Sequence, residues 1–82
     1  MLSNLEKNEK VVGTKQVKRA ILSGNVQVVF IAKDAEEKVV GDLKTLCNKK
    51  NIEIVYVDTM KELGKACGID ISAASAALLN KK

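Results

Sequence analysis

Residues that can donate hydrogen bonds to an anion lie at the expected start of a helix. Gly13 and Thr14 stand directly before a short helical pattern, and Lys15 and Gln16 open it. A helix start offers unpaired backbone N–H groups and the positive end of the helix dipole, and both favour an anion. Lysine can donate hydrogen bonds to guanine or to phosphate, and glutamine can donate and accept at a base edge. These residues therefore predict contact with a polyanion such as RNA.

The same helix separates polar from apolar side chains. At about 100° per residue, Lys18 and Arg19 lie on the side of the donors. The opposite side is apolar and consists of Val17, Ala20 and Ile21. The polar side is either an RNA contact or the solvated face that most charge runs form. Gly13 and Thr14 also fit an ordinary helix N-cap, which is compatible with both interpretations.

A second candidate site follows the expected stop of a later helix. After Gly68, the apolar residues Ile69 and Ile71 flank a single carboxylate, that of Asp70. One interpretation is that both isoleucines enter a strand and point into the core, which the spacing favours. The other is an apolar platform for an unstacked base, with Asp70 accepting a hydrogen bond from the amino edge of that base. The residues alone leave both interpretations open.

Length, charge and residue types narrow the classes of function. The chain has 82 residues, enough for one domain, and 14 Lys and Arg against 10 Asp and Glu give a formal net charge of +4. That excess suits a polyanionic partner and also an ordinary basic surface. Without histidine, a glycine-rich phosphate loop or a nucleophile beside a base, the chain is expected to be neither an enzyme nor a cofactor carrier. One Phe and one Tyr cannot stack successive bases, which favours structured RNA over single strands.

Cysteine usage and hydropathy indicate where the protein works. Cys47 and Cys67 have no paired-cysteine spacing and no histidine to complete a zinc site, so we expect buried thiols in a reducing cytoplasm. Residues 1–7 lack the apolar run of a signal peptide, and no stretch is apolar enough to span a membrane. A heptad seam is also missing. We therefore predict a cytoplasmic monomer that binds neither a membrane nor DNA.

Strand-like and helix-like patterns alternate along the chain. Residues 26–32 and 52–57 are runs of β-branched and aromatic side chains, typical of central strands. Between them, residues 35–50 show a helical pattern whose apolar stripe consists of Val39, Leu43, Leu46 and Cys47. Strands that alternate with helices through short loops predict an α/β domain with helices on both faces of a small sheet.

The last helix and the end of the chain give different signals. Thr59 and Glu62 have capping-box spacing, which predicts a helix over residues 60–67 with Gly68 as its left-handed stop. Residues 72–79 are rich in alanine, whose propensity favours a helix. The alternation of small side chains in the same segment fits a strand that is packed closely by helices. Propensity alone does not decide this element.

Three motifs occur in one order over nearly the whole chain. They are Gly13-Thr14-Lys15-Gln16 followed by Arg19, then residues 28–35, then residues 62–71 followed by the small-residue tail. The combination resembles the ribosomal protein L7Ae/L30e family, and most of all its short bacterial paralogues. This resemblance implies a three-layer α-β-α sandwich with a four-stranded mixed sheet, in which the alanine-rich tail is the final strand.

The resemblance also implies a partner, the kink-turn, an RNA helix bent sharply at a bulge beside tandem sheared G·A pairs. In the family, a helix start enters the groove at the G·A pairs, and it corresponds here to Gly13, Thr14, Lys15 and Gln16. Arg19 matches a basic position that supports the same contact. Lys15-Gln16 stands where many archaeal relatives have Asn-Glu, and the variant also resembles the L30e branch.

A second family contact is the loop before the last strand, which lies over the bulged nucleotides. It corresponds to Ile69, Asp70 and Ile71, so the resemblance favours the base platform over the strand. Lys33 and Asp34 match a strand-end position beside the pocket for the extruded nucleotide. The implied mechanism is shape-selective, because the protein would trap a kinked conformer that already exists. The alternative function is a protein-interaction module that docks through this loop and its strand.

Overall fold

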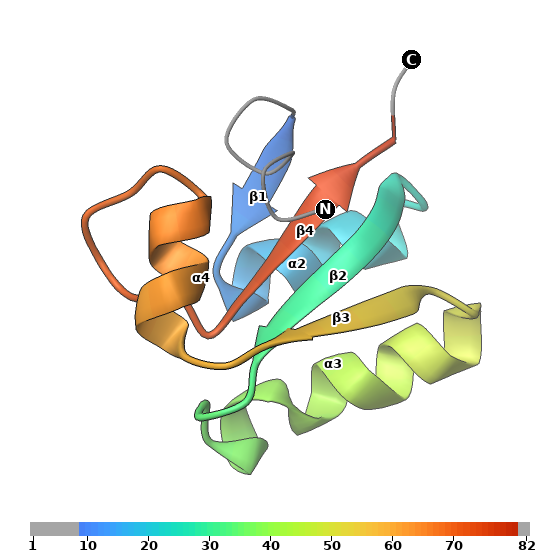
Figure 1. Cartoon of the computed structure of the whole chain (residues 1–82). Helices are drawn as coiled ribbons and strands as arrows, with labels where there is room; N and C mark the ends of the chain where they lie inside the picture. Colours follow the sequence, from blue (N-terminus) through green and yellow to red (C-terminus); the bar gives the residue numbers. More distant parts are fainter. Residues whose placement is uncertain (1–8, 81–82) are drawn as a thin grey trace.

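The computed structural model describes residues 9–80, which form a mixed four-stranded sheet between helices (Figure 1). In chain order the elements are β1 (Lys10–Val12), α2 (Thr14–Leu22), β2 (Val26–Ala32), α3 (Glu37–Lys50), β3 (Glu53–Val57), α4 (Met60–Ala66) and β4 (Ser75–Leu79). The strand order is β1-β4-β2-β3, with β2 parallel to β3 and β4 antiparallel to both of its neighbours. The predicted mixed sheet is therefore confirmed. Residues 1–7, on which the signal-peptide prediction depended, lie outside the described residues.

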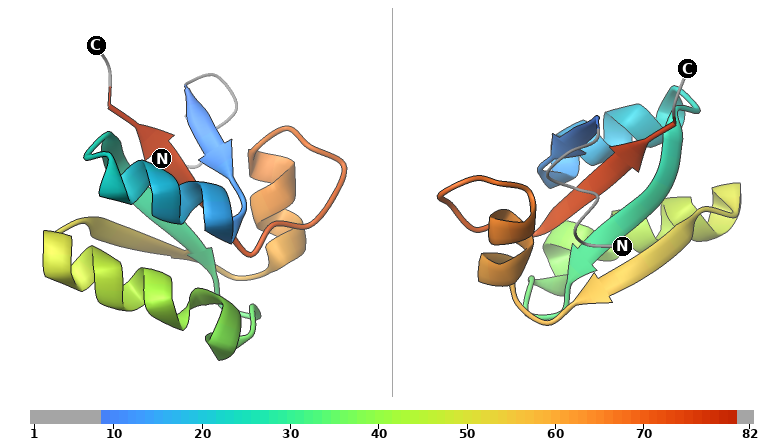
Figure 2. Two further views of the ribbon diagram at one scale, coloured as in Figure 1. Left: turned by 180° about the vertical axis from the view of Figure 1, so that it is seen from behind. Right: turned by 45° about the horizontal axis from the view of Figure 1, so that its top comes forward.

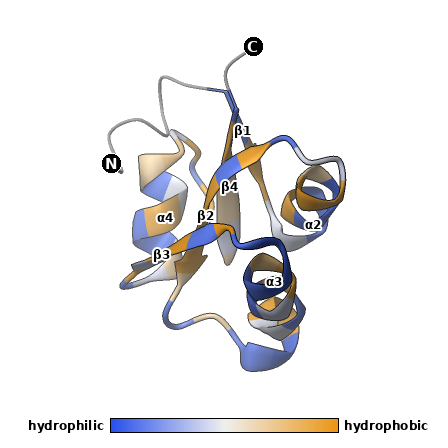
Figure 3. Cartoon of the chain, turned by 90° about the vertical axis from the view of Figure 1, so that its right-hand side faces the viewer, coloured by the Kyte–Doolittle hydropathy of each residue, from blue (hydrophilic) through white to orange (hydrophobic). Residues whose placement is uncertain are grey.

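Helices cover both faces of the sheet (Figures 2 and 3). On one face α2 and α3 bury Val17, Ile21, Val40, Leu43 and Cys47 against Val29, Ile31 and Ala77. On the other face α4 buries Leu63 and Cys67 against Val28, Phe30, Ala32, Ala76 and Leu78. Successive residues of β2 thus enter opposite cores, which explains its continuous apolar run. The predicted α-β-α sandwich is confirmed.

The buried face of α3 differs by one position from the predicted stripe. Val40 is 1% exposed, whereas Val39 is 39% exposed and faces the solvent side. Val40, Leu43 and Cys47 follow helical spacing, and Val39 precedes the first of them by about 100° of rotation. Leu46 is half-buried beside the stripe. The prediction was right about the helix and wrong about Val39, and the helix starts at Glu37 instead of residue 35.

The alanine-rich tail is a strand, β4, in the interior of the sheet. Its neighbours are β1 on one side and β2 on the other, and Ser75, Ala76 and Ala77 are each 0% exposed. Helices press on both faces at this point, and small side chains permit that close packing. Tertiary contacts thus override the helical propensity of alanine. The strand implied by the family resemblance is confirmed.

The ends of α4 follow the predicted local signals. Thr59 Oγ1 accepts a hydrogen bond from the backbone N–H of Glu62 at 3.0 Å. At the other end, Gly68 has φ +78° and donates to the Lys65 carbonyl, while Ile69 donates to the Gly64 carbonyl. This pair of bonds is a Schellman motif, and it reverses the chain into the following loop. The helix ends at Ala66, one residue before the predicted end.

Both cysteines are free and buried, one in each core. Burial raises the pKa of the Cys47 thiol, and it also raises the pKa of the Cys67 thiol against an opposing effect of Lys10. Among residues 9–80, no group of side chains could hold a metal ion. No helix in the same residues has the length and apolar character needed to cross a membrane.

Candidate nucleic-acid interface

Gly13 lets the chain turn directly from β1 into α2. Its φ of +100° and ψ of 141° lie in a region that side chains rarely permit. The Gly13 N–H donates to the Ser75 carbonyl at 2.9 Å, and its own carbonyl accepts from the Val17 N–H at 2.9 Å. No atom lies within 4 Å of the place where a Cβ would stand. The first turn of α2 is therefore open to an approaching ligand.

Thr14 is the first residue of α2 and not its cap. Its Oγ1 lies 3.0 Å from Ser75 Oγ, and no side-chain hydrogen bond caps the helix start. The predicted N-cap is confirmed at Gly13 but is wrong for Thr14, whose hydroxyl joins the helix to β4 instead. The partner is 61 residues away in the sequence, so no local pattern could reveal it.

The exposed side of α2 carries the predicted donors. Lys15, Gln16, Lys18 and Arg19 are exposed. Val17 and Ile21 are buried on the opposite side as predicted, while Ala20 is only half-buried. Lys18 Nζ lies 3.6 Å from Asp42 Oδ2, so it is partly neutralised. Within residues 9–80, neither Lys15 nor Arg19 has an ion pair, and the first turn of α2 has no acidic residue. Positive potential therefore remains at this helix start.

The segment between α4 and β4 is a loop and not a strand. Ile71 is 73% exposed, and Asp70 is exposed beside it. Ile69 is half-buried and packs against the core under α4. The interpretation in which both isoleucines enter a strand and point into the core is therefore wrong, because the strand begins only at Ser75. The loop instead presents a branched apolar side chain to solvent.

This loop is held by the backbone of α4. A Cβ on Gly64 would overlap the carbonyl oxygen of Ile71, so the loop crosses α4 where only glycine leaves room. The Ala73 N–H also donates to the Met60 carbonyl at 3.0 Å. These contacts fix the backbone at Ile71 and at Ala73, although the side chain of Ile71 is exposed.

The start of α2 and the end of the loop lie side by side (Figure 2). Ser75 is the first residue of β4, and its carbonyl accepts a hydrogen bond from the Gly13 N–H. The hydroxyl of Ser75 contacts the hydroxyl of Thr14. The loop leads directly into this residue. The structure thus brings the two predicted segments to one edge of the molecule.

Lys33 and Asp34, in the turn after β2, contact residues at or just before the start of α4 that are distant in the sequence. Lys33 Nζ lies 3.2 Å from Asp58 Oδ1 at the surface. Asp34 Oδ1 accepts a hydrogen bond from the Met60 N–H at 2.8 Å, at the start of α4. Since the Met60 carbonyl in turn holds Ala73, Asp34 is connected to the loop through the backbone of α4.

Sequence reasoning missed two residues that position these segments, Gly64 and Ser75. A glycine inside a helical pattern is a signal for close backbone approach, and Gly64 carries that signal. Ser75 is a lone polar side chain within a small-residue strand, and it is 0% exposed. A buried hydroxyl needs a partner, which Thr14 supplies.

Comparison with solved structures defines the class of fold. The chain is similar to a 15.5 kD RNA binding protein of Giardia lamblia, with a TM-score of 0.91 and 21% sequence identity, over 99% of this chain and 72% of that chain. It is also similar to a protein with unknown function from Bacillus halodurans C, with a TM-score of 0.84 and 25% identity, over 94% of this chain and 81% of that chain.

The sequence comparisons then give the family. The ribosomal protein L7Ae/L30e/S12e/Gadd45 family matches residues 2–82, and the chain belongs to it. An RNA-binding protein of Caldanaerobacter subterraneus is 58% identical over 69 residues, 84% of each chain. An RNA-binding protein of Halalkalibacterium halodurans is 53% identical over 68 residues, 83% of each chain. The predicted membership is confirmed, and so is the prediction that the chain is not an enzyme.

Proposed function

We propose that this protein binds structured RNA and that it recognises and stabilises the kink-turn. One observation carries the proposal. Exposed donors at the start of α2 and an exposed apolar loop lie on one edge, joined through Ser75. The RNA-binding names of the relatives support the same class of partner.

At the start of α2, the proposed contacts are to the edges of the G·A pairs. Lys15 donates to guanine, and Gln16 donates or accepts at a neighbouring base edge. Gly13 leaves the backbone uncovered, so the RNA can approach the unpaired N–H groups of the first turn. Arg19 lies one turn further along the same exposed side and supports the contact with its guanidinium. Thr14 acts indirectly, because its hydroxyl holds the helix to β4.

The loop supplies the second proposed contact. Ile71 lies over the bulged nucleotides, and Asp70 accepts a hydrogen bond from an exposed amino group of a base. Ile69 anchors the loop in the core and so fixes the position of both. Lys33 and Asp34 border the pocket of the extruded nucleotide, and the contact of Asp34 with Met60 gives it a positioning role. The protein binds the kinked conformer better than the extended one and so shifts the equilibrium toward it.

The proposed working form is a single domain and a monomer, without a cofactor, in the cytoplasm. Two free, buried thiols suit a reducing compartment. Both hydrophobic cores are formed by residues of one chain, because helices cover both faces of the sheet.

The test is a titration against a kink-turn RNA and the same RNA with its tandem G·A pairs changed to Watson–Crick pairs, at one salt concentration. Replacement Lys15→Ala is expected to reduce the discrimination between the two RNAs by roughly 1–3 kcal/mol, because a base contact is lost. Lys50→Gln is the control, since Lys50 is exposed at the far end of α3.

The two remaining outcomes contradict the proposal in different ways. Equal binding of both RNAs, with a steep dependence on salt, would leave a general basic surface. No binding of either RNA would favour the protein-interaction module, with the loop as its docking edge.

A further inference from the structure

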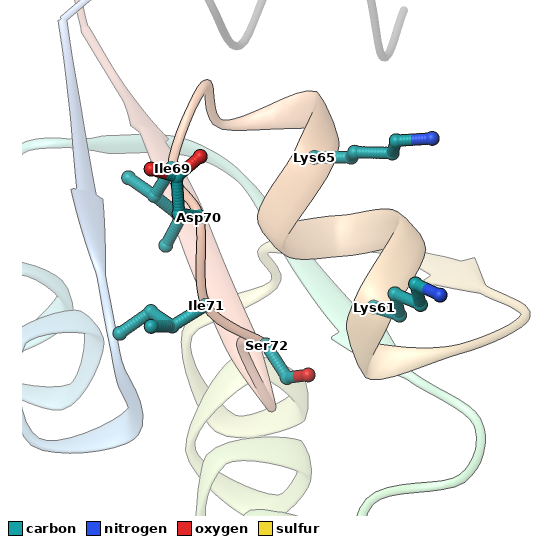
Figure 4. A pocket seen from close by; sticks show the side chains of 6 residues that line it. All are labelled: Lys61, Lys65, Ile69, Asp70, Ile71 and Ser72. Carbon is teal, nitrogen blue, oxygen red and sulfur yellow. The ribbon is translucent and has the colours of Figure 1, made fainter.

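A pocket lies between the loop and α4, beside the proposed kink-turn contacts. Its volume is about 300 Å³, and its lining is Lys61, Lys65, Ile69, Asp70, Ile71 and Ser72 (Figure 4). We propose that this pocket is a second RNA contact, which takes a backbone phosphate with Lys61 and Lys65 as its charge partners. The inference rests on the proposed function, because the phosphate belongs to the RNA strand that crosses the loop.

The two lysines form one cationic face of α4. They are four residues apart, so they lie on the same side of the helix, and both are exposed. Among residues 9–80 neither has an ion pair, in contrast to Lys18, Lys33, Lys38 and Lys44. Their charges are therefore free for an external anion.

Helix stability accounts for only one of the two lysines, because Lys65 lies in the last turn of α4, where the helix dipole favours a cation. Like charges four residues apart destabilise a helix slightly. Lys61 also lies in the first turn of α4, where the helix dipole disfavours a cation. Removal of both charges should therefore change the stability of the fold little, and helix stability gives no reason for a cation at Lys61.

One further lining residue, Ser72, can bind a phosphate. The exposed hydroxyl of Ser72 can donate to a phosphate oxygen, and a lysine ammonium binds phosphate as a compact point charge. Two cations against the one carboxylate of Asp70 leave the pocket net positive. The lysine stems line the pocket, and their ammonium groups extend into solvent where flexible chains can follow an RNA backbone (Figure 4).

The placement fits a strand that passes over the loop. In Figure 4 the side chain of Ile71 points away from the side on which Lys61 and Lys65 extend. Bases and phosphates alternate along a strand, so a base against Ile71 brings the neighbouring phosphate toward α4. Ile71 of the loop and the two lysines of α4 would then hold adjacent parts of one RNA strand.

The test compares two double variants that remove the same charge. Lys61→Gln with Lys65→Gln changes the pocket, and Lys49→Gln with Lys50→Gln changes the exposed last turn of α3, at the other end of the molecule (Figure 1). Glutamine is a good helix former, so both variants should fold. Affinity for the kink-turn RNA and for its Watson–Crick counterpart is measured from 0.1 to 1 M salt.

The pocket variant is expected to reduce the steepness of log affinity against log salt by about 0.7–0.9, the loss of one phosphate contact. If binding is equal at 1 M salt, this change of slope corresponds to a loss of about 5- to 8-fold at 0.1 M. Discrimination between the two RNAs should stay unchanged, because phosphates carry no sequence information. The α3 variant should keep the wild-type slope.

Three results would overturn the inference. Equal losses in both double variants would mean that net charge alone matters. Unchanged binding in both would mean that the α4 face does not meet RNA and is open to a protein partner. If the wild-type protein does not prefer the kink-turn RNA, the proposed function is wrong and this inference is wrong with it. This result is measured on the wild-type protein alone, so it can be told apart from the effects of the lysine variants.

A neutral methylphosphonate placed at single positions of the RNA locates the phosphate. At one position the methylphosphonate should weaken binding of the wild-type protein. It should have little further effect on the pocket variant, because that variant has already lost the interaction of the lysines with this phosphate. Equal sensitivity of both proteins at every position would contradict the assignment.

Discussion

The start of α2 and the loop before β4 reach the same edge by different physical means. The α2 start is joined to β4 by hydrogen bonds of Gly13 and Thr14, and it presents charged and amide donors. The loop is held by the backbone of α4, and it presents the apolar side chain of Ile71. Donors can distinguish base edges, whereas an apolar surface can only complement a shape. The proposed interface thus assigns the G·A pairs to the start of α2 and the bulged nucleotides to the loop.

Each segment also depends on one glycine, for a different reason. Gly13 adopts a backbone conformation with positive φ and has open space around it. Gly64 has an ordinary helical conformation, but the Ile71 carbonyl occupies the space of its Cβ. Substitutions at these two positions can therefore separate backbone strain from steric overlap.

The largest effect is expected for Gly64→Ala. The added methyl group must displace the loop, so the free energy of unfolding should fall by about 1–3 kcal/mol and binding of the kink-turn RNA should be lost. Gly41→Ala in α3 is the matched control, because its Cβ would meet only the flexible Glu37 side chain, at 3.0 Å from Oε2. Alanine in a helix interior should raise stability there by about 0.5–1 kcal/mol. Urea denaturation checks both values, and equal stability of the two variants would contradict the overlap.

The next effect is expected for Gly13→Ala, which tests the other segment. An alanine with this backbone conformation should cost about 1–3 kcal/mol of folding stability and weaken RNA binding, because the first turn of α2 shifts. Gly24→Ala is the control at the opposite end of α2, where φ is +77° and space is also open. That variant should cost about 1–2 kcal/mol of stability and leave RNA discrimination intact. Thermal unfolding and RNA titration measure the two quantities, and an equal loss of discrimination would argue against the α2 start as a contact.

Within the loop, Ile71→Ala and Ile69→Ala should separate binding from stability. Ile71 is exposed, so its truncation should weaken kink-turn binding by about 1–2 kcal/mol with little change in the free energy of unfolding. Ile69 packs against the core, so its truncation should mainly reduce stability. Neither change should alter the salt slope, because no charge is removed. A loss of stability in the Ile71 variant would show that the side chain serves the fold.

The smallest effects are expected at the turn after β2. Asp34→Ala removes the acceptor of the Met60 N–H, which should lower stability by about 1 kcal/mol and loosen the loop slightly. Lys33→Gln breaks only a surface ion pair with Asp58, worth about 0.2–1 kcal/mol. Denaturation curves and RNA titrations of both variants test this order. A larger loss of RNA affinity for Lys33→Gln than for Asp34→Ala would indicate direct contact by the lysine.

Local patterns predicted much of this protein because their causes are local. The run in β2, the cap at Thr59 and the stop at Gly68 depend on neighbours within one helical turn or one strand. The run at residues 52–57 predicted a strand correctly but a central position wrongly, because β3 (Glu53–Val57) lies at the edge of the sheet. The donor face of α2 follows from helical spacing alone. The error at Val39 has the same origin, since a stripe can be shifted by one residue when two valines are adjacent and only the packing partner decides which is buried.

The sequence by itself determined the alternation of elements, both ends of α4 and the chemistry of the exposed donors. Only the tertiary structure decided that the alanine-rich tail is an inner strand and that the loop at Ile71 stays outside the core. It also decided that Ser75 joins Thr14 across 61 residues and that Gly64 makes room for the loop. The physical reason is that burial on both faces of a sheet and contact between distant backbones are properties of neighbours in space, which no short window of sequence contains.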